Sequence, residues 1–209
     1  MAKPAPLAGV RIIECSMLGP GALTTHLVDL GAEVIKVESP AGDNGRKMTW
    51  PFYGDTSLLH LHVNRGKQSL VLNLKQPDGI AVFEDLVRGA DVVVEAMRPG
   101  FLAKMGLGYD RLKELNPKIV MCTISGYGAT GPYQNLPSHG IAYDAWSGTI
   151  QPVVDDEGFT HIPDQANIGI TAWPAFGAIG ILGALVRAEK TGEGACMEIA
   201  QSDRSAYFD

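Results

Sequence analysis

The first 125 residues alternate short apolar runs with segments of helical periodicity, and this alternation constrains the fold more than any other feature of the sequence. Five apolar runs are predicted to be strands: Val10–Cys15, which is rich in β-branched residues and expected to be buried on both faces, Glu33–Glu38, Ser69–Leu72, Asp91–Glu95 and Ile119–Ile124. Helices are predicted between them: Ala22–Leu30, Pro77–Arg88 and Tyr109–Leu115. Because apolar strands that alternate with helices form parallel sheets covered on both faces, the sequence predicts an α/β fold, a Rossmann-like doubly wound sheet with flanking helices.

The chain changes character after residue 125, where glycines become frequent. Four further segments are predicted there: a helix over His139–Thr149, an exposed connection over Gln151–Gln165, a long buried helix over Thr171–Glu189 and a strand over Ala195–Ala200. We expect residues 1–150 to form a Rossmann-like ligand-binding domain. Residues 151–209 then add a connection, a long apolar helix and a final strand to the same large domain.

The composition excludes several classes of function. Seventeen Lys and Arg against 23 Asp and Glu give a net charge of −6, so binding to nucleic acid, which needs a cationic face, is not expected. The three cysteines are far apart and odd in number, which favours reduced thiols in a cytoplasmic protein. The N-terminus lacks an apolar signal segment, and Pro174 and several glycines interrupt the longest apolar run. We therefore expect no signal peptide and no membrane span.

Cationic side chains gather where a parallel sheet binds its ligands. Such sheets bind ligands beyond the carboxyl ends of their strands. Five lysines and arginines fall on or near the loops expected there: Arg46, Lys47, Lys75, Arg98 and Lys104. Each alone is typical of a solvated surface. Together, in an acidic protein, they indicate a ligand with several phosphates, because Lys and Arg pair well with phosphate oxygens.

A second pattern imitates the dinucleotide fingerprint, in which a glycine-rich turn is followed by an acidic residue. Gly19-Pro20-Gly21 and Glu38 supply these parts. However, Thr24 stands where the third glycine belongs, and Pro20 removes an amide that could face phosphate. We interpret the segment as a tight strand-to-helix turn rather than as a nicotinamide site.

Histidines offer weaker signals. His139 lies in the glycine-rich region and can exchange a proton near neutral pH, although a lone histidine is more often structural. His60 and His62 alternate like neighbours on a strand or loop. With no carboxylate nearer than Asp55 and no cysteine close by, no metal site is predicted. The sequence also contains neither a P-loop nor a G-x-S-x-G elbow.

Several motifs together resemble the family III CoA-transferases, which include formyl-CoA transferase, carnitine CoA-transferase and α-methylacyl-CoA racemase. The resemblance runs from about Pro6 to the last residue and rests on these segments: PLAGVRIIE, DLGAEVIKVESP, NRGKQSLVLNLKQPDG, ADVVVEAMRPG, MGLGYDRLKELNPKIV, SGYGATGP and GILGALVRAEKTGEG. Members of the family are considerably longer. The resemblance therefore implies the N-terminal part of such a protein, without the small domain and the returning C-terminal segment.

The resemblance implies coenzyme A as the ligand, with no metal. The positions that match the family's CoA-binding loops are Leu18, Gly19, Leu72, Asn73, Leu74, Lys75, Ala96, Met97, Arg98 and Lys104. In this reading Lys75, Arg98 and Lys104 face the 3′-phosphate and pyrophosphate. The backbone near Leu72 and Met97 sandwiches adenine, and the loop at Leu18 and Gly19 faces the thioester.

The chemistry implied by the resemblance is incomplete in this sequence. Transferases of the family use an aspartate that attacks the acyl-CoA, but alignment places Gly169 or Ile170 at that position. The racemase branch uses a histidine that matches His139, together with the same aspartate. Three explanations stay open: a different acid or base (His139, Asp144 or Asp164), an inactive partner in a heteromer, or a CoA-binding protein without turnover.

The leading prediction is an enzyme that moves CoA between an acyl-CoA and a carboxylic acid acceptor. The alternatives are racemisation or isomerisation at the α-carbon of an acyl-CoA with His139 as base, and a non-catalytic CoA-binding subunit. The resemblance further implies an interlocked homodimer or a heteromer with a related subunit.

Overall fold

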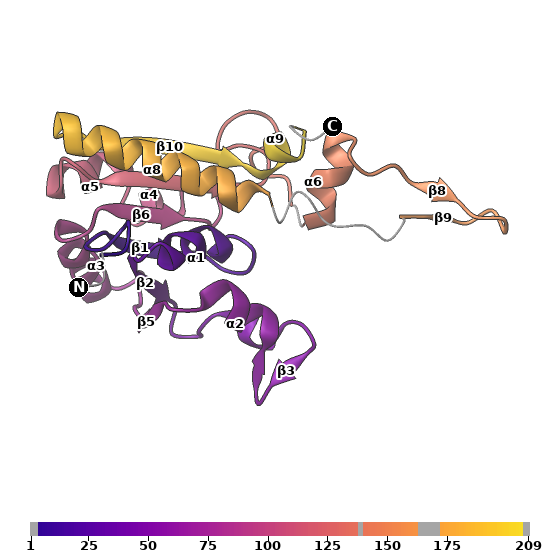
Figure 1. The fold of residues 1–209 in the computed structure, drawn as a ribbon, viewed down its shortest axis with the longest axis horizontal. Helices are drawn as coiled ribbons and strands as arrows, with labels where there is room; N and C mark the ends of the chain where they lie inside the picture. The colour runs from indigo at the N-terminus through magenta and orange to yellow at the C-terminus, as the bar shows by residue number, and fades with distance from the viewer. Residues whose placement is uncertain (1–3, 138–139, 163–171, 207–209) are drawn as a thin grey trace.

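A computed structural model describes residues 4–137, 140–162 and 172–206 of the 209-residue chain, and its centre is a parallel sheet of six strands. The six strands are β1 (Arg11–Cys15), β2 (Glu33–Glu38), β5 (Gln68–Val71), β6 (Val92–Glu95), β7 (Val120–Ser125) and β10 (Ala195–Ala200). Their order across the sheet is β10-β7-β6-β1-β2-β5, and each neighbouring pair is parallel (Figure 1).

This order confirms the predicted Rossmann-like fold. Counted along the sheet by position in the chain, the strands run 3-2-1-4-5-6, the order of a doubly wound dinucleotide-binding sheet. The chain first builds outward from β1 through β2 to β5, then crosses back to place β6 on the other side of β1. The direction of winding therefore reverses between β1 and β6, and a crevice is expected at that point.

Helices cover both faces of the sheet, as the alternation predicts. On one face, α1 (Gly21–Asp29) and α8 (Trp173–Thr191) pack against each other and on Ile12. On the opposite face, α3 (Pro77–Arg88), α4 (Phe101–Lys104) and α5 (Tyr109–Leu115) pack on the next residue of β1, Ile13. Successive strand residues point to opposite faces, so the two adjacent isoleucines each pack into a separate hydrophobic core.

The polar stretch between β2 and β5 contains structure that the sequence did not reveal. It forms a 3-10 turn η1 (Asn44–Lys47), a hairpin of β3 (Phe52–Tyr53) and β4 (Thr56–Ser57), and helix α2 (Leu58–Asn64). His60 and His62 both lie on α2, so their prediction as strand or loop neighbours is wrong. The overlooked signal is Ser57, whose hydroxyl caps the helix by accepting the Leu59 N–H at 3.2 Å.

After residue 125 the described residues form several further elements besides β10 and α8. They are α6 (Gly140–Ser147), the hairpin of β8 (Val153–Val154) and β9 (Thr160–His161), and α9 (Gln201–Ala206) after β10. The segment expected to be an exposed connection is this hairpin, which projects away from the sheet (Figure 1). The division of the chain at residue 150 stays a prediction, although β10 completes the sheet by pairing with β7.

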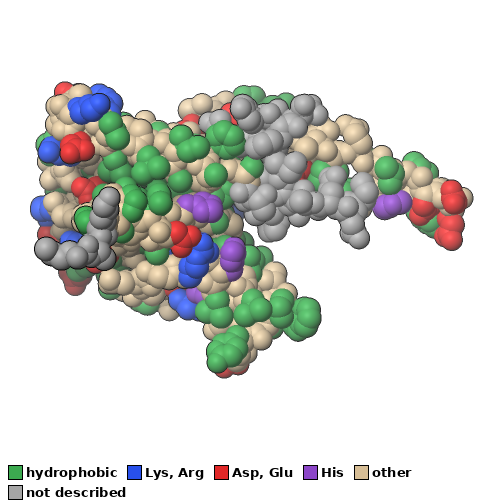
Figure 2. Space-filling model, in the orientation of Figure 1, with side chains coloured by type: hydrophobic (Ala, Val, Ile, Leu, Met, Phe, Trp, Pro, Cys, Tyr) green, Lys and Arg blue, Asp and Glu red, His purple; other side chains and the backbone are tan. Residues whose placement is uncertain are grey.

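Two projections carry exposed apolar side chains. The lobe of β3 and β4 exposes Trp50 and Tyr53, at 84% and 78% of their surface, and the β8–β9 hairpin exposes Val154 and Phe159. In the space-filling view, hydrophobic side chains gather at the tip of the β3 lobe (Figure 2). Within the described ranges, none of the helices combines the length and the hydropathy needed to cross a bilayer.

Candidate functional site

A pocket of about 270 Å³ opens at the carboxyl ends of the strands around β1, where the winding reverses. Segments 15–17, 37–44 and 72–75 line it, together with Met97 and Phe101. These residues follow β1, β2, β5 and β6, so four loops far apart in the sequence meet in one place. Its lining is largely apolar with three charged side chains, Glu38, Asp43 and Lys75, which is the usual composition of a small-molecule site.

The pocket brings together five of the ten residues predicted to bind CoA. Leu72, Asn73, Leu74, Lys75 and Met97 all line it. The other five do not: Leu18, Gly19, Ala96, Arg98 and Lys104. These five lie on the loops after β1 and β6 and on α4, a few positions along the chain from lining residues. Their assignment as ligand-binding residues stays a prediction.

The loop that carries Met97 and Arg98 is fixed by a buried carboxylate. Glu95, the last residue of β6, accepts the Leu102 N–H at 2.8 Å, so the chain from 96 to 101 closes on itself. Gly100 begins α4 with a φ of 72°, a conformation that favours glycine. Burial raises the pKa of Glu95 despite its bonds to backbone N–H groups of α4. The loop thus has a defined shape before any ligand arrives.

The cations near the pocket divide into paired and unpaired groups. Arg46 is paired with Glu38, with Nη2 and Oε1 2.6 Å apart, so part of its hydrogen-bonding capacity is already used. Lys47, Lys75, Arg98 and Lys104 form no ion pair with any described residue, and all four are exposed. Of these four, Lys75 lines the pocket, and an unpaired charge there can attract an anionic ligand without first breaking an internal bond.

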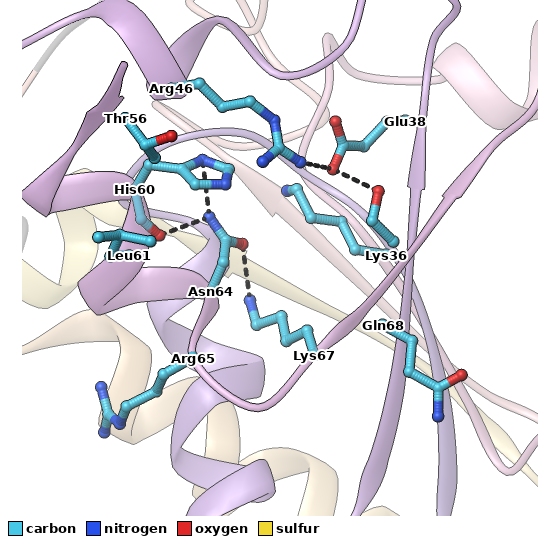
Figure 3. A pocket seen from close by; sticks show the side chains of 11 residues that line it. Lys36, Glu38, Arg46, Thr56, His60, Leu61, Asn64, Arg65, Lys67 and Gln68 are labelled. Carbon is cyan, nitrogen blue, oxygen red and sulfur yellow. Dashed lines mark hydrogen bonds and ion pairs between the residues drawn. The ribbon is translucent and has the colours of Figure 1, made fainter. Parts of the chain in front are cut away.

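A second cavity, of about 260 Å³, lies between α2 and the strands β2 and β5 (Figure 3). Its charges are compensated internally, because each of its lysines and arginines already faces a carboxylate. The pairs are Lys36 with Glu14 and Asp43, Lys67 with Glu14, Arg46 with Glu38, and Arg65 with Asp29. The cavity is therefore lined by a structural ionic network, and the first pocket is the better candidate for an anionic coenzyme.

The buried part of this network centres on Glu14 and Lys36. Burial alone raises the pKa of Glu14, but the charges of Lys67 and Lys36 outweigh it and hold that pKa below its ordinary value. Burial alone lowers the pKa of Lys36, but Glu14 and Asp43 outweigh it and raise that pKa. Both groups are therefore charged near neutral pH, and each depends on the other for stability in the interior.

The resemblance of the first loop to a dinucleotide fingerprint has no structural support. Glu38 accepts hydrogen bonds from Arg46, from the Asp43 N–H at 3.0 Å and from the Ser69 hydroxyl at 2.8 Å, so its oxygens serve the protein. The Gly21 N–H donates to the Leu18 carbonyl at 2.9 Å. This bond closes a tight strand-to-helix turn, in agreement with our interpretation.

The catalytic candidates are mostly outside the part of the chain that the structure describes. His139, Asp164, Gly169 and Ile170 all lie there, so the structure neither supports nor contradicts their roles. Asp144 is buried on α6 and lines neither cavity. Their catalytic roles stay predictions. Among the described residues, no three His, Cys, Asp or Glu side chains gather closely enough to hold a metal ion.

Cys15 forms part of the pocket floor but is a poor nucleophile. Burial, with the charges of Glu95 and Glu14, raises the pKa of its thiol far above the ordinary value. The thiolate is the reactive form of cysteine, and it is therefore scarce at this position near neutral pH. The described fold gives Cys15 a packing role beneath the pocket.

Six parallel strands in this order, with a pocket at the reversal of winding, define an α/β protein of the doubly wound class. The sequence pattern of CoA-transferase family III matches residues 7–208, and the chain belongs to that family. The resemblance inferred from the sequence motifs is thereby confirmed.

Named relatives and solved structures agree with this assignment. The chain is 35% identical over 209 residues to acetyl-CoA:oxalate CoA-transferase of Acetobacter aceti, covering 99% of this chain and 54% of that protein. It is 41% identical over 193 residues to human succinyl-CoA:glutarate CoA-transferase, covering 90% and 43%. The crystal structure of Rv3272 from M. tuberculosis superposes with a TM-score of 0.89 at 31% identity, over 99% of this chain and 58% of that one. The chain thus spans about half the length of its curated relatives.

Proposed function

We propose that this chain supplies the coenzyme-binding part of an enzyme that transfers CoA from an acyl-CoA to a carboxylic acid. Family membership and the names of the relatives support this reading, since they are CoA-transferases for oxalate and glutarate. The observation that carries the proposal is the apolar pocket at the reversal of winding, with the unpaired Lys75 in its lining. The same region bears the residues that match the family's CoA-binding loops.

In this proposal the phosphates of CoA face Lys75, Arg98 and Lys104, and the adenine lies between the backbone near Leu72 and Met97. The pocket supports it in two ways. Leu72, Lys75 and Met97 line one cavity although they come from two different loops. Arg98 and Lys104 stand on the loop and helix directly after Met97, exposed and without an ion pair among the described residues, so phosphate oxygens can bind them at low cost.

Substitution of Arg98 tests the placement of CoA. We expect Arg98→Ala to weaken CoA binding by about 1–3 kcal/mol, the value of a lost charge-assisted hydrogen bond, as measured by isothermal titration calorimetry. Arg88→Ala is the matched control, because Arg88 is an exposed arginine at the C-terminal end of α3, paired with Asp85. Equal affinity of the Arg98→Ala variant and the wild-type chain would show that Arg98 is only a surface charge.

The covalent step is tested separately from binding. Transferases of the family form an acyl or CoA adduct on a carboxylate, which hydroxylamine traps and mass spectrometry detects. No adduct after incubation with an acyl-CoA under turnover would remove the nucleophilic mechanism for this chain. Loss of α-carbon deuterium exchange in His139→Ala would favour proton transfer instead, and retention of exchange would exclude His139 as the base.

A second candidate is a CoA-binding subunit of a heteromer. Gly169 or Ile170 at the position of the family's aspartate favours it. The relatives also include subunits named as beta and alpha of succinyl-CoA–L-malate CoA-transferase from Chloroflexus aurantiacus, 36% identical to this chain in both cases. In that case activity appears only when a related subunit that carries the aspartate is added, and each protein alone is inactive.

Self-association is part of the same proposal. Exposed Trp50, Tyr53 and Phe159 on the two projections are unusual for a surface in contact with water, and they support a homodimer or a heteromer. Sedimentation equilibrium over a range of protein concentrations tests this, and a monomer at all concentrations would contradict it. We also infer a cytoplasmic setting, since all three cysteines are free thiols.

A further inference from the structure

The wall of the pocket is a segment with little regular structure of its own. Residues 39–44, which follow β2, supply six of the seventeen residues that line the pocket. The segment contains Gly42 with a φ of 80°, and regular hydrogen bonding resumes only at η1. Its one backbone bond within the wall runs from the Gly42 N–H to the Ser39 carbonyl, at 2.8 Å. A segment of this kind needs side-chain anchors to keep one shape.

Two buried carboxylates provide these anchors. Glu38, at the start of the wall, accepts hydrogen bonds from the Asp43 N–H at 3.0 Å and from Arg46 at 2.6 Å. Glu38 directly precedes the wall, so these bonds tie the end of the wall back to its beginning. The hydroxyl of Ser69 in β5 also donates to the Glu38 carboxylate, at 2.8 Å. Asp43 accepts the Gly45 N–H at 2.7 Å and lies 3.1 Å from Lys36 Nζ.

These anchors also connect the wall to the floor of the pocket. Lys36 donates to the carbonyl of Ser16 at 2.6 Å, and Ser16 is itself a lining residue. One ammonium thus holds the wall, through Asp43, and the floor, through Ser16. The Arg46 guanidinium lies beside the Glu38 carboxylate in the lining of the second cavity (Figure 3). The ionic network behind the pocket is arranged to hold the pocket open in one shape.

We propose that Glu38 and Arg46 act as a latch that positions the pocket wall for CoA, Glu38 being a positioning residue that acts through its bonds to Arg46 and to the Asp43 N–H. This rests on the proposed function, because it takes CoA as the occupant of the pocket. Glu38 is suited to the role since its side chain is only 3% exposed and three protein donors occupy its oxygens. Pre-organised walls reduce the entropy lost on binding, so a loosened wall lowers affinity.

The sign of the effect separates this latch from simple electrostatics. CoA is a polyanion, so removal of a nearby negative charge strengthens binding if only charge matters. Release of Arg46 from Glu38 would strengthen it further by freeing a cation. The latch predicts the opposite, because Glu38→Gln removes the charge that holds Arg46. We expect this variant to bind CoA about tenfold more weakly, corresponding to about 1.4 kcal/mol.

The experiment combines calorimetry with amide hydrogen exchange on the whole chain. CoA affinity and exchange of residues 39–46 are measured for wild type, Glu38→Gln, Arg46→Gln and the double variant. Glu33→Gln is the matched control, because Glu33 is also on β2 and pairs with Arg11 at 2.7 Å, at the opposite end of the strand from the pocket. Arg46 is half-buried, so Arg46→Gln supplies a second test if Glu38→Gln does not fold.

The latch predicts weaker CoA binding and faster exchange of the wall in both single variants, with Glu33→Gln unchanged. In the double variant the two amides can pair with each other, so CoA affinity and exchange of the wall return toward the wild-type values. Unchanged or tighter binding in Glu38→Gln overturns the proposal, and so does weaker binding without faster exchange. If the wild-type chain does not bind CoA, the proposed function fails, and exchange of the wall without ligand still decides whether the latch exists.

Discussion

Replacement of Lys36 by methionine probes the buried network most directly. The Lys36 side chain is 2% exposed, and its ammonium lies 3.1 Å from Glu14 and 3.1 Å from Asp43. At this distance and an effective dielectric constant of about 20, each pair is worth about 5 kcal/mol before the cost of desolvation. Lys36→Met removes one partner from each of two buried carboxylates, and Lys67 stays paired with Glu14. We expect the free energy of unfolding to fall by about 3–5 kcal/mol at neutral pH.

The loss depends on pH in a definite direction. The pKa of Glu14 is lowered below 4.5 in the folded wild type, so its ionisation stabilises the fold above that pH and the contribution is lost as pH falls. Without Lys36, the negative charge of Glu14 is less stabilised in the folded variant, so its ionisation contributes less to the free energy of unfolding. The difference between variant and wild type is therefore largest above about pH 5 and shrinks on acidification. The raised pKa of Lys36 keeps the wild-type ammonium charged up to at least its ordinary value of 10.5.

Urea unfolding of both proteins, followed by fluorescence at several pH values and one protein concentration, measures this difference. Arg88→Met is the control, since Arg88 and Asp85 form an exposed pair on α3 whose loss costs under about 1 kcal/mol. A loss below about 1 kcal/mol for Lys36→Met at pH 7, or a loss that stays constant down to pH 4, would refute the reasoning.

The remaining predictions concern packing and thiol reactivity. In helix α8, a Cβ added at Gly177 would overlap the side chain of Leu23 in α1, whereas one added at Gly183 meets nothing within 4 Å. We expect Gly177→Ala to lower the free energy of unfolding by about 1–3 kcal/mol through overpacking, and Gly183→Ala to raise it by up to about 1 kcal/mol. Thermal denaturation measures both, and equal effects would contradict the packing. Iodoacetamide at pH 8 should label exposed Cys196 before the buried cysteines Cys15 and Cys122, because burial raises the pKa of Cys122 to about 12. Mass spectrometry of the native protein measures the order of labelling, and early labelling of Cys122 would refute the prediction.

Much of the fold could be predicted because its signals are local. Runs such as Glu33–Glu38 contain three β-branched residues in six, and the structure places that strand at the predicted bounds. Gly31 follows helix α1 with a φ of 100°, as expected for a residue that ends a helix. Helix α2 was missed because its seven residues include two histidines and an asparagine, which weaken the apolar period. Short amphipathic helices depend on tertiary packing more than on propensity.

The candidate site could be predicted only in part. The loops at the carboxyl ends follow from strand order, so the expectation that Leu72–Lys75 and Met97 converge required only the topology. The pairing of the cations did not follow, and Arg46 was grouped with Arg98 although Glu38 holds it. Nothing in the composition of the loops after β2 and β6 distinguishes the paired Arg46 from the unpaired Arg98.

The sequence by itself determined the parallel sheet, its helices and the edge at which the candidate pocket lies, because strand and helix periods are set by neighbouring residues. The tertiary structure alone decided which charges near that pocket are paired and which are not. Glu14 meets Lys36 and Lys67, which lie 22 and 53 positions away, and Glu38 meets Ser69, 31 positions away. Such pairs form only after the chain has crossed back on itself, and desolvation then makes each buried charge dependent on its partner.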